Sequence, residues 1–419
     1  MVVYEQFDNG LRLLTEPMPG ARSISFGVWL TRGSRHEQAA HSGIAHLVEH
    51  MLFKGTATRS AQDIAQEIDS IGGQLDAFTA KECASYYVKV LDEHLPRAVD
   101  VLADLLLRPA FDPEEVAREK KVVLEEIKMV EDTPDELVHE LFTQRFWSGH
   151  PLGRPILGVP ATVGPIDSAT LRDYFARAYT AGNLVIAAAG NVEHEGVRNL
   201  VAEAFADVPA NGETVPVTPP ATVPALTLRD KAIEQCHVCL GVDGYPQRHD
   251  DRYVCYLLNI VLGGSMSSRL FQNIRERRGL AYAVNSGLVS YHDGGMLSIY
   301  AGCDAHAVRE VVGLIVAELR DLRDNLISEA ELRRAQDHLK GSLVLSLESS
   351  ASRMSHMARQ QMYFGRQFTL EDTLRGVEAV TREDVRRVAR DLLPPGSLSA
   401  TVLGPVDGIE LGDDQLALA

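Results

Sequence analysis

Hydrophobic and polar residues along the chain repeat with the periods of strands and helices, and they do so in two similar successions. In each half, strand-like segments lead to two consecutive helices, strands follow, and helices fill the remainder. In the first half we predict strands at 11–15, 23–31 and 86–91 and helices at 42–53 and 61–71. In the second half we predict strands at 236–242, 281–289 and 295–302 and helices at 251–262 and 268–276.

This repeated order is typical of a duplicated α+β domain. We predict two homologous α/β-sandwich domains, each with a mostly antiparallel sheet covered by helices. Between them lies Thr214-Val-Pro-Val-Thr-Pro-Pro-Ala-Thr-Val-Pro224, and proline can continue neither a helix nor a central strand. The predicted division is a first domain at 1–213, a linker at 214–226 and a second domain at 227–419.

Candidate chemistry is concentrated in the predicted helix at 42–53. His46 and His50 are four residues apart and therefore lie one turn apart on one face, where two imidazoles can converge on one ion. Glu49 shares that face without needing to be a ligand. This is the inverted H-x-x-E-H form of the H-E-x-x-H zinc motif, in which a carboxylate takes a proton from a water that the metal activates.

A simpler interpretation is two partly solvated histidines, since the chain has 14. The rest of the helix argues against it, because Leu47, Val48, Met51, Leu52 and Phe53 are apolar. A polar stripe on so apolar a helix is either buried or functional, and buried charge needs a partner. We therefore favour a metal site.

Catalytic zinc usually has three protein ligands, and the best source of a third is a predicted helix that starts at Asp112-Pro113 and ends near residue 131. On this helix Glu125 has mainly charged neighbours, whereas Glu126 lies on an apolar stripe interrupted only by carboxylates. We predict Glu126 as the ligand. Glu119, two turns earlier on that stripe, either orients a ligand or the water, or forms a surface ion pair.

The second half does not repeat these groups. When Gly55 is registered on Gly263, positions 46, 49 and 50 fall on apolar residues, Val254, Leu257 and Leu258. We therefore expect one Zn²⁺ per chain, held by the first domain.

Composition and charge exclude other classes of function. The net charge of −17 disfavours nucleic acid, because phosphate binding needs clustered Lys and Arg. Five scattered cysteines form no disulfide framework, and those of Cys236-His-Val-Cys239 would point to opposite faces of a strand. With no signal peptide and no apolar stretch long enough to span a membrane, we expect a cytoplasmic protein that does not contact membranes.

Over nearly its whole length the sequence resembles the pitrilysin and mitochondrial processing peptidase family of inverzincin peptidases, in particular its bacterial processing-peptidase-like members. The resemblance is carried by His46-Leu-Val-Glu49-His50-Met-Leu-Phe-Lys-Gly-Thr and by Arg118-Glu119-Lys-Lys-Val-Val-Leu-Glu-Glu126. It implies zinc held by His46, His50 and Glu126. It also implies Glu49 as the catalytic base, with Glu119 beside the ligands.

The resemblance further implies where substrate binds. An Arg and a Tyr seven residues apart in the non-catalytic second domain, here Arg275 and Tyr282, would face the substrate carbonyl, and both are donors suited to an oxyanion. An edge strand would pair with the substrate backbone, here Asp76-Ala77-Phe78, where the family commonly has Asn-Ala. A carboxylate cannot donate the hydrogen bond of an amide, and Asp76 would instead favour cationic substrate groups.

We expect a zinc endopeptidase that cleaves unfolded peptides or presequence-like segments. The alternatives are a non-catalytic scaffold subunit like the core proteins of the respiratory cytochrome complex, and a simple metal-binding or peptide-binding module. Glu49 favours the enzyme, because a structural metal site has no use for a carboxylate beside the ligands. Since long family members have four domains and this chain two, the resemblance implies a homodimer or a heterodimer with an inactive homologous subunit.

Overall fold

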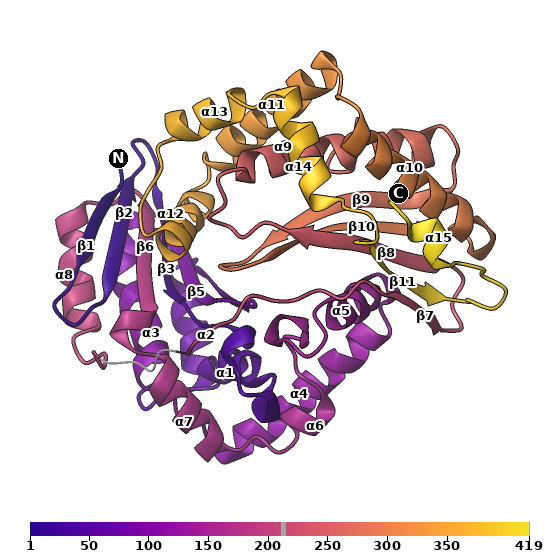
Figure 1. Ribbon diagram of the computed structural model, residues 1–419. Helices are drawn as coiled ribbons and strands as arrows, with labels where there is room; N and C mark the ends of the chain where they lie inside the picture. The colour runs from indigo at the N-terminus through magenta and orange to yellow at the C-terminus, as the bar shows by residue number, and fades with distance from the viewer. Residues whose placement is uncertain (211–214, 419) are drawn as a thin grey trace. The chain divides into compact units, whose positions relative to one another are not determined.

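A computed structural model describes residues 1–210 and 215–418, and the chain forms two compact units (Figure 1). Unit 1 consists of Met1–Met129, Arg154–Val217 and Leu345–Gln367, and unit 2 of Val130–Gly153, Thr218–Val344 and Phe368–Ala419. Both combine a sheet with covering helices, so the predicted α+β class is confirmed. The predicted boundary at residues 213 and 214 lies outside the described residues.

The sheet of unit 1 is antiparallel except at one pair. Its strand order is β1-β2-β6-β3-β5-β4, with β2 and β6 parallel. β4 therefore forms one edge of this sheet. The strands are β1 Val3–Gln6, β2 Arg12–Pro17, β3 Ser23–Leu30, β4 Gln74–Thr79, β5 Ala84–Leu91 and β6 Leu184–Gly190.

Helices cover both faces of this sheet. One face packs on the main core of the unit, and Leu13, Phe26 and Val28 point into that core. The alternating residues Leu14 and Trp29 point to the other face, where helix α12 (Ser350–Phe364) covers them. The helices on the core side include α1 Ile44–Leu52, α2 Ala61–Ser70, α3 Leu95–Leu107, α4 Pro113–Glu131, α7 Ser168–Ala178 and α8 His194–Ala204.

Unit 2 repeats this arrangement. Its sheet has the order β7-β11-β8-β10-β9, again with a parallel pair, β7 and β11, at the position equivalent to β2 and β6. The strands are β7 Leu226–Asp230, β8 Cys236–Gly244, β9 Ala281–Ser290, β10 Gly295–Cys303 and β11 Ser399–Gly404. The helices include α9 Arg252–Leu262, α10 Val308–Asp324, α11 Glu329–Ser346, α13 Leu370–Glu378 and α14 Arg382–Leu392.

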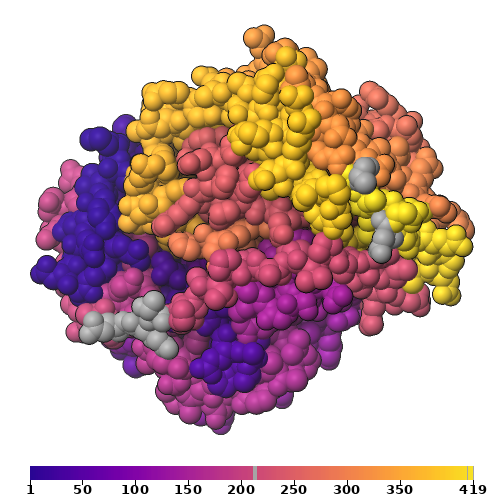
Figure 2. Space-filling view, in the orientation of Figure 1, coloured from indigo at the N-terminus to yellow at the C-terminus, as the bar shows by residue number. Residues whose placement is uncertain are grey.

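Two helices are exchanged between the halves of the chain. Helix α5 (Pro134–Phe146) comes from the first half but packs on the sheet of unit 2, where Phe142 joins Cys239 and Tyr300. Helix α12 comes from the second half but packs on β2, β3 and β6 of unit 1, and its orange surface adjoins the indigo N-terminal strands in Figure 2. The units are therefore not the contiguous halves 1–213 and 227–419, although one junction, Val217 to Thr218, lies within the predicted linker.

Cys236 lies in the main core of unit 2 and Cys239 in the cluster under α5, on opposite faces of β8 as predicted. The helix predicted at 268–276 is present from residue 269, and its last six residues, η6 (Phe271–Glu276), form a π-helix. Among residues 1–210 and 215–418, no helix is both long and apolar enough to cross a membrane.

The exchanged helix α12 is expected to contribute strongly to stability. Met354 is fully buried against the sheet of unit 1, and truncating a buried methionine to alanine leaves a cavity. We predict that Met354→Ala lowers the free energy of unfolding by about 2–4 kcal/mol, measured by urea denaturation. The control is Met266→Ala, at a side chain that is 75% exposed, for which a change below about 0.5 kcal/mol is expected. Equal effects of both variants would contradict this packing.

Candidate metal centre

Helix α1 presents one apolar and one polar face. Ile44, Ala45, Leu47, Val48, Met51 and Leu52 are buried in the core of unit 1. His46, Glu49 and His50 lie on the remaining face, at the spacing that places them on consecutive turns. The burial of the apolar face therefore determines where the three polar side chains point.

The structure brings His46, His50 and Glu126 together, with Glu126 supplied by α4. One ligand atom from each lies within 4.8 Å of the other two. Glu126 Oε2 is 3.6 Å from His50 Nε2 and 3.8 Å from His46 Nε2. Two ligand atoms about 2.1 Å from one metal at the tetrahedral angle lie about 3.4 Å apart, so a small inward movement would complete a zinc site.

An unpaired carboxylate oxygen in this cluster also suits a cation. Glu126 Oε2 is buried and has no hydrogen-bond partner among the described residues. Leaving a carboxylate oxygen buried without a partner is costly, and a divalent ion would remove that cost. Two imidazoles and one carboxylate form the donor set of many catalytic zinc sites, and the residues present therefore fit zinc.

The two adjacent glutamates of α4 have different surroundings. Glu125 is 68% exposed and forms a surface ion pair with Lys128, whereas Glu126 is 32% exposed and faces the imidazoles. Their helix places them about 100° apart, so they cannot share one environment. Glu125, which has the charged neighbours in the sequence, is therefore the solvated glutamate of the two.

Glu119 fixes the orientation of His50. Its Oε2 lies 3.0 Å from His50 Nδ1, and Lys54 donates to its Oε1 at 2.7 Å. Because a carboxylate only accepts, Nδ1 of His50 carries the proton and Nε2 keeps its lone pair for a metal. Glu119 is buried, so its pair with Lys54 is not the surface ion pair considered from the sequence.

Burial also sets the protonation of His46. Desolvation, with a smaller effect of the nearby His50, lowers the pKa of His46 to about 4. Its imidazole is therefore neutral at neutral pH. Neutral imidazole is the form that binds a metal.

Glu49 lies beside the cluster and is held by a residue that the sequence did not single out. The hydroxyl of Thr79, the last residue of β4, donates a hydrogen bond to Glu49 Oε2. Burial raises the pKa of Glu49, and the Thr79 hydrogen bond opposes that rise. Thr79 follows the motif Asp76-Ala77-Phe78, but no sequence signal connects it with α1.

The other predicted substrate-binding residues fall into two places. Asp76, Ala77 and Phe78 lie on the edge strand β4, where Asp76 is exposed and accepts a hydrogen bond from the Tyr87 hydroxyl at 3.1 Å. Arg275 and Tyr282 lie in unit 2, on η6 and β9. There the Arg275 guanidinium carbon is 5.1 Å from the centroid of the Tyr282 ring, which is 78% exposed.

The equivalent of α1 in unit 2 carries no such chemistry. Val254, Leu257 and Leu258 lie on α9 and are buried in the core of that unit. Helix α9 is thus a packing element.

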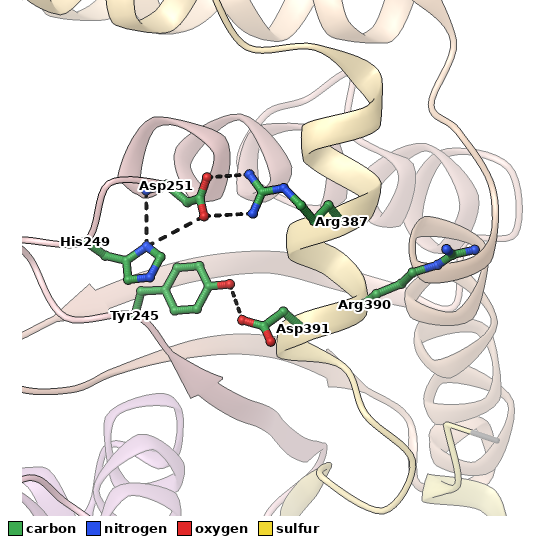
Figure 3. A pocket seen from close by; sticks show the side chains of 6 residues that line it. All are labelled: Tyr245, His249, Asp251, Arg387, Arg390 and Asp391. Carbon is green, nitrogen blue, oxygen red and sulfur yellow. Dashed lines mark hydrogen bonds and ion pairs between the residues drawn. The ribbon is translucent and has the colours of Figure 1, made fainter.

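A further pocket, of about 540 Å³, lies in unit 2 between the end of α14 and the loop before α9 (Figure 3). Its polar groups are engaged with one another or with the backbone. Arg387 pairs with Asp251 at 2.6 Å, Tyr245 donates to Asp391, and Arg390 donates to the backbone oxygen of Arg323. These contacts tie α14 to the loop before α9 and to α10.

Comparisons with known proteins agree on one family. Residues 12–159 match the family model of insulinase (peptidase family M16), and residues 165–339 match that of the peptidase M16 inactive domain. The chain is 44% identical to the uncharacterized zinc protease YmxG of Bacillus subtilis, over 92% of this chain and 94% of that protein. It is 43% identical to an uncharacterized zinc protease of Mycobacterium tuberculosis, over 95% of this chain and 92% of the relative.

Solved structures share the fold. A peptidase M16 inactive domain from Pseudomonas fluorescens superimposes with a TM-score of 0.91 at 24% identity, covering 96% of this chain and 98% of that one. A protease from Helicobacter pylori gives a TM-score of 0.90 at 22% identity, covering 96% and 99%.

The adjacent glutamates of α4 allow a matched test of the cluster. We predict that Glu126→Gln weakens zinc binding more than Glu119→Gln, which should weaken it by about 10- to 100-fold. Glu125→Gln is the control, and because it removes only a surface ion pair it should leave zinc affinity within about twofold. Affinity is measured by competition with a chromogenic chelator. If Glu125→Gln weakened binding as much as Glu126→Gln, the assignment of the third ligand would be wrong.

Proposed function

The chain belongs to the insulinase family of peptidases, family M16, and we propose that it is a zinc-dependent endopeptidase that cleaves unfolded peptides or presequence-like segments. The observation that carries this proposal is the cluster of His46, His50 and Glu126 with the non-ligand carboxylate of Glu49 beside it. The naming of its relatives as zinc proteases supports the same activity. We propose one Zn²⁺ per chain, and a homodimer or a heterodimer with an inactive homologous subunit.

Zinc would be held by His46, His50 and Glu126, and when bound it supplies a Lewis acid that lowers the pKa of water and polarises a carbonyl group. Glu49 acts as the general base. Its carboxylate accepts a proton from the attacking water, a step that the raised pKa of Glu49 favours, and the protonated group then returns that proton to the leaving amine. Thr79 holds the carboxylate in place through one oxygen and leaves the other for this exchange.

Substrate would bind as an additional strand on β4. This strand ends the sheet of unit 1, so its outer side pairs with no other strand of that sheet and would accept an extended peptide, although the N–H of Ala77 donates to Asp76 Oδ1 at 2.8 Å and would have to be released if it bound substrate. Ala77 lies on this strand, and Phe78, which is 42% exposed, offers an apolar contact. In unit 2, Arg275 and Tyr282 are proposed as donors to the substrate carbonyl, with exposure of the Tyr282 ring as support.

A non-catalytic scaffold is the competing function. A scaffold needs neither a His46 imidazole that desolvation keeps neutral nor a partly buried carboxylate that is kept out of the ligand set. Glu49 is costly to bury, and its hydrogen bond to Thr79 compensates only in part. We therefore favour the enzyme.

Glu49→Gln tests the enzyme directly. We predict that this variant keeps its zinc but loses about 100-fold or more in kcat/KM on unfolded peptides, because the amide cannot accept the proton.

In the wild type the base must be ionised, so activity should fall as the pH is lowered through the pKa of Glu49, which burial raises above 4.5. A zinc-loaded wild type that cleaves no member of a mixed peptide library would instead favour the scaffold.

Asp76→Asn tests the substrate preference. The Asp76 carboxylate is exposed on the edge strand, and it lies close enough to Glu49 to raise the pKa of that group. We predict that Asp76→Asn reduces the preference for peptides with Arg or Lys near the cleaved bond by roughly 2- to 5-fold, by mass-spectrometric profiling of products. The control is Asp207→Asn, an exposed carboxylate of unit 1 outside α1, α4 and β4. An unchanged profile for Asp76→Asn would show that this carboxylate does not select substrates.

A further inference from the structure

The first turn of α1 has no cap of its own. The N-cap residue is Gly43, which has no side chain to accept a hydrogen bond from the first backbone N–H groups. Helix N-termini leave several such donors unsatisfied, and a buried start without a partner is destabilising. The two residues that follow, Ile44 and Ala45, are buried, so water does not replace the cap.

Gly43 cannot be exchanged for a capping residue. Its φ of 98° lies in the left-handed region, and a Cβ at this position would lie 2.6 Å from the backbone oxygen of Leu157 and 2.9 Å from Val163 Cγ2. Serine or aspartate, the usual caps, would be strained and would clash. The cap therefore has to come from elsewhere in the chain.

Glu37 supplies it. Its Oε2 accepts a hydrogen bond from the N–H of Gly43 at 2.9 Å, and its Oε1 accepts one from the N–H of Ala45 at 2.8 Å. The residue is only 6% exposed. Burial raises the pKa of Glu37 to about 7, and the hydrogen bonds from the N–H groups of Ala45 and Gly43 oppose that rise because they favour the ionised carboxylate.

The backbone of Glu37 is itself fixed by two hydrogen bonds. Arg154 donates to its backbone oxygen at 3.0 Å, and its own N–H donates to the backbone oxygen of Ser34 at 3.3 Å. Its carboxylate is therefore a fixed point against which the first turn of α1 is set. Ala45, one of the two residues that it binds, immediately precedes His46.

We propose that Glu37 is a positioning residue of the metal centre, which sets the first turn of α1 so that His46 meets Glu126 of α4. The inference rests on the metal site of the proposed function. His46 and Glu126 come from different helices, and their separation must be correct to within about 0.5 Å for tight coordination. His46 also has no hydrogen-bond partner at Nδ1 among the described residues, so its position depends on the backbone that carries it.

The test compares Glu37→Gln with Met354→Ala. The glutamine is nearly isosteric, but its amide group would face one of the two N–H donors and repel it. Met354→Ala is the control for general destabilisation, because Met354 packs on the opposite side of the unit 1 sheet from the core that contains α1. Two quantities are measured under conditions in which both variants remain folded. They are zinc affinity, by chelator competition, and amide hydrogen exchange of peptides that cover residues 43–50.

For Glu37→Gln we expect zinc affinity to fall by about 10-fold or more. Amide hydrogen exchange at residues 43–50 should be faster in zinc-free Glu37→Gln than in the zinc-free wild type. Met354→Ala should keep the affinity within about twofold and the wild-type exchange at these residues. Wild-type zinc affinity and exchange in Glu37→Gln would overturn the inference, as would an equal loss of affinity in Met354→Ala. Failure of the proposed function is a separate result, because it would appear as a zinc-loaded wild type without peptidase activity.

Discussion

The burial of one face of helix α1 is the constraint on which the whole site depends. The core of unit 1 buries Ile44, Leu47 and Met51, and this packing fixes the direction in which the polar face of the helix points. Contacts beyond the helix complete the restraint. Glu37 binds its first turn, and Glu119 binds His50 near its end. The chemistry of the site is thus carried by a short helix that is restrained by packing on one face and by hydrogen bonds near both ends.

Burial shifts the pKa values of His46 and Glu49, two groups of this polar face, in opposite directions, and each shift suits the role proposed for that group. It lowers the pKa of His46, so the imidazole stays neutral and can bind a metal, and it raises the pKa of Glu49, so the carboxylate becomes a better proton acceptor. On α4, Glu126 has a buried carboxylate oxygen without a hydrogen-bond partner among the described residues. Desolvation thus favours the metal-binding form of His46 and the proton-accepting role of Glu49.

The sequence predicted those features that depend on which face of an element a residue occupies. The period of His46 and His50 and the contrast between Glu125 and Glu126 are properties of single helices, and the structure brings the expected side chains together. Contacts between distant segments could not be read in this way. Thr79 reaches Glu49 across 30 residues, and nothing in the local pattern of β4 connects it with α1. The exchange of α5 and α12 escaped prediction because apolar residues at helical spacing show that a face is buried but not which sheet covers it.

The exchanged helix α12 has a consequence for the order in which the protein can be made. Unit 1 carries the metal cluster and begins at the N-terminus, yet its sheet lacks one covering layer until Phe364 of the 419 residues has been synthesised. Domains generally fold as units during synthesis, N-terminal first. Here the apolar face formed by Leu14, Trp29 and Val185 stays uncovered by α12 until residues 350–364 have left the ribosome. Unit 1 is therefore completed only after most of unit 2 has been made, and a translation product that stops before α12 would carry all the candidate metal ligands on an incomplete unit.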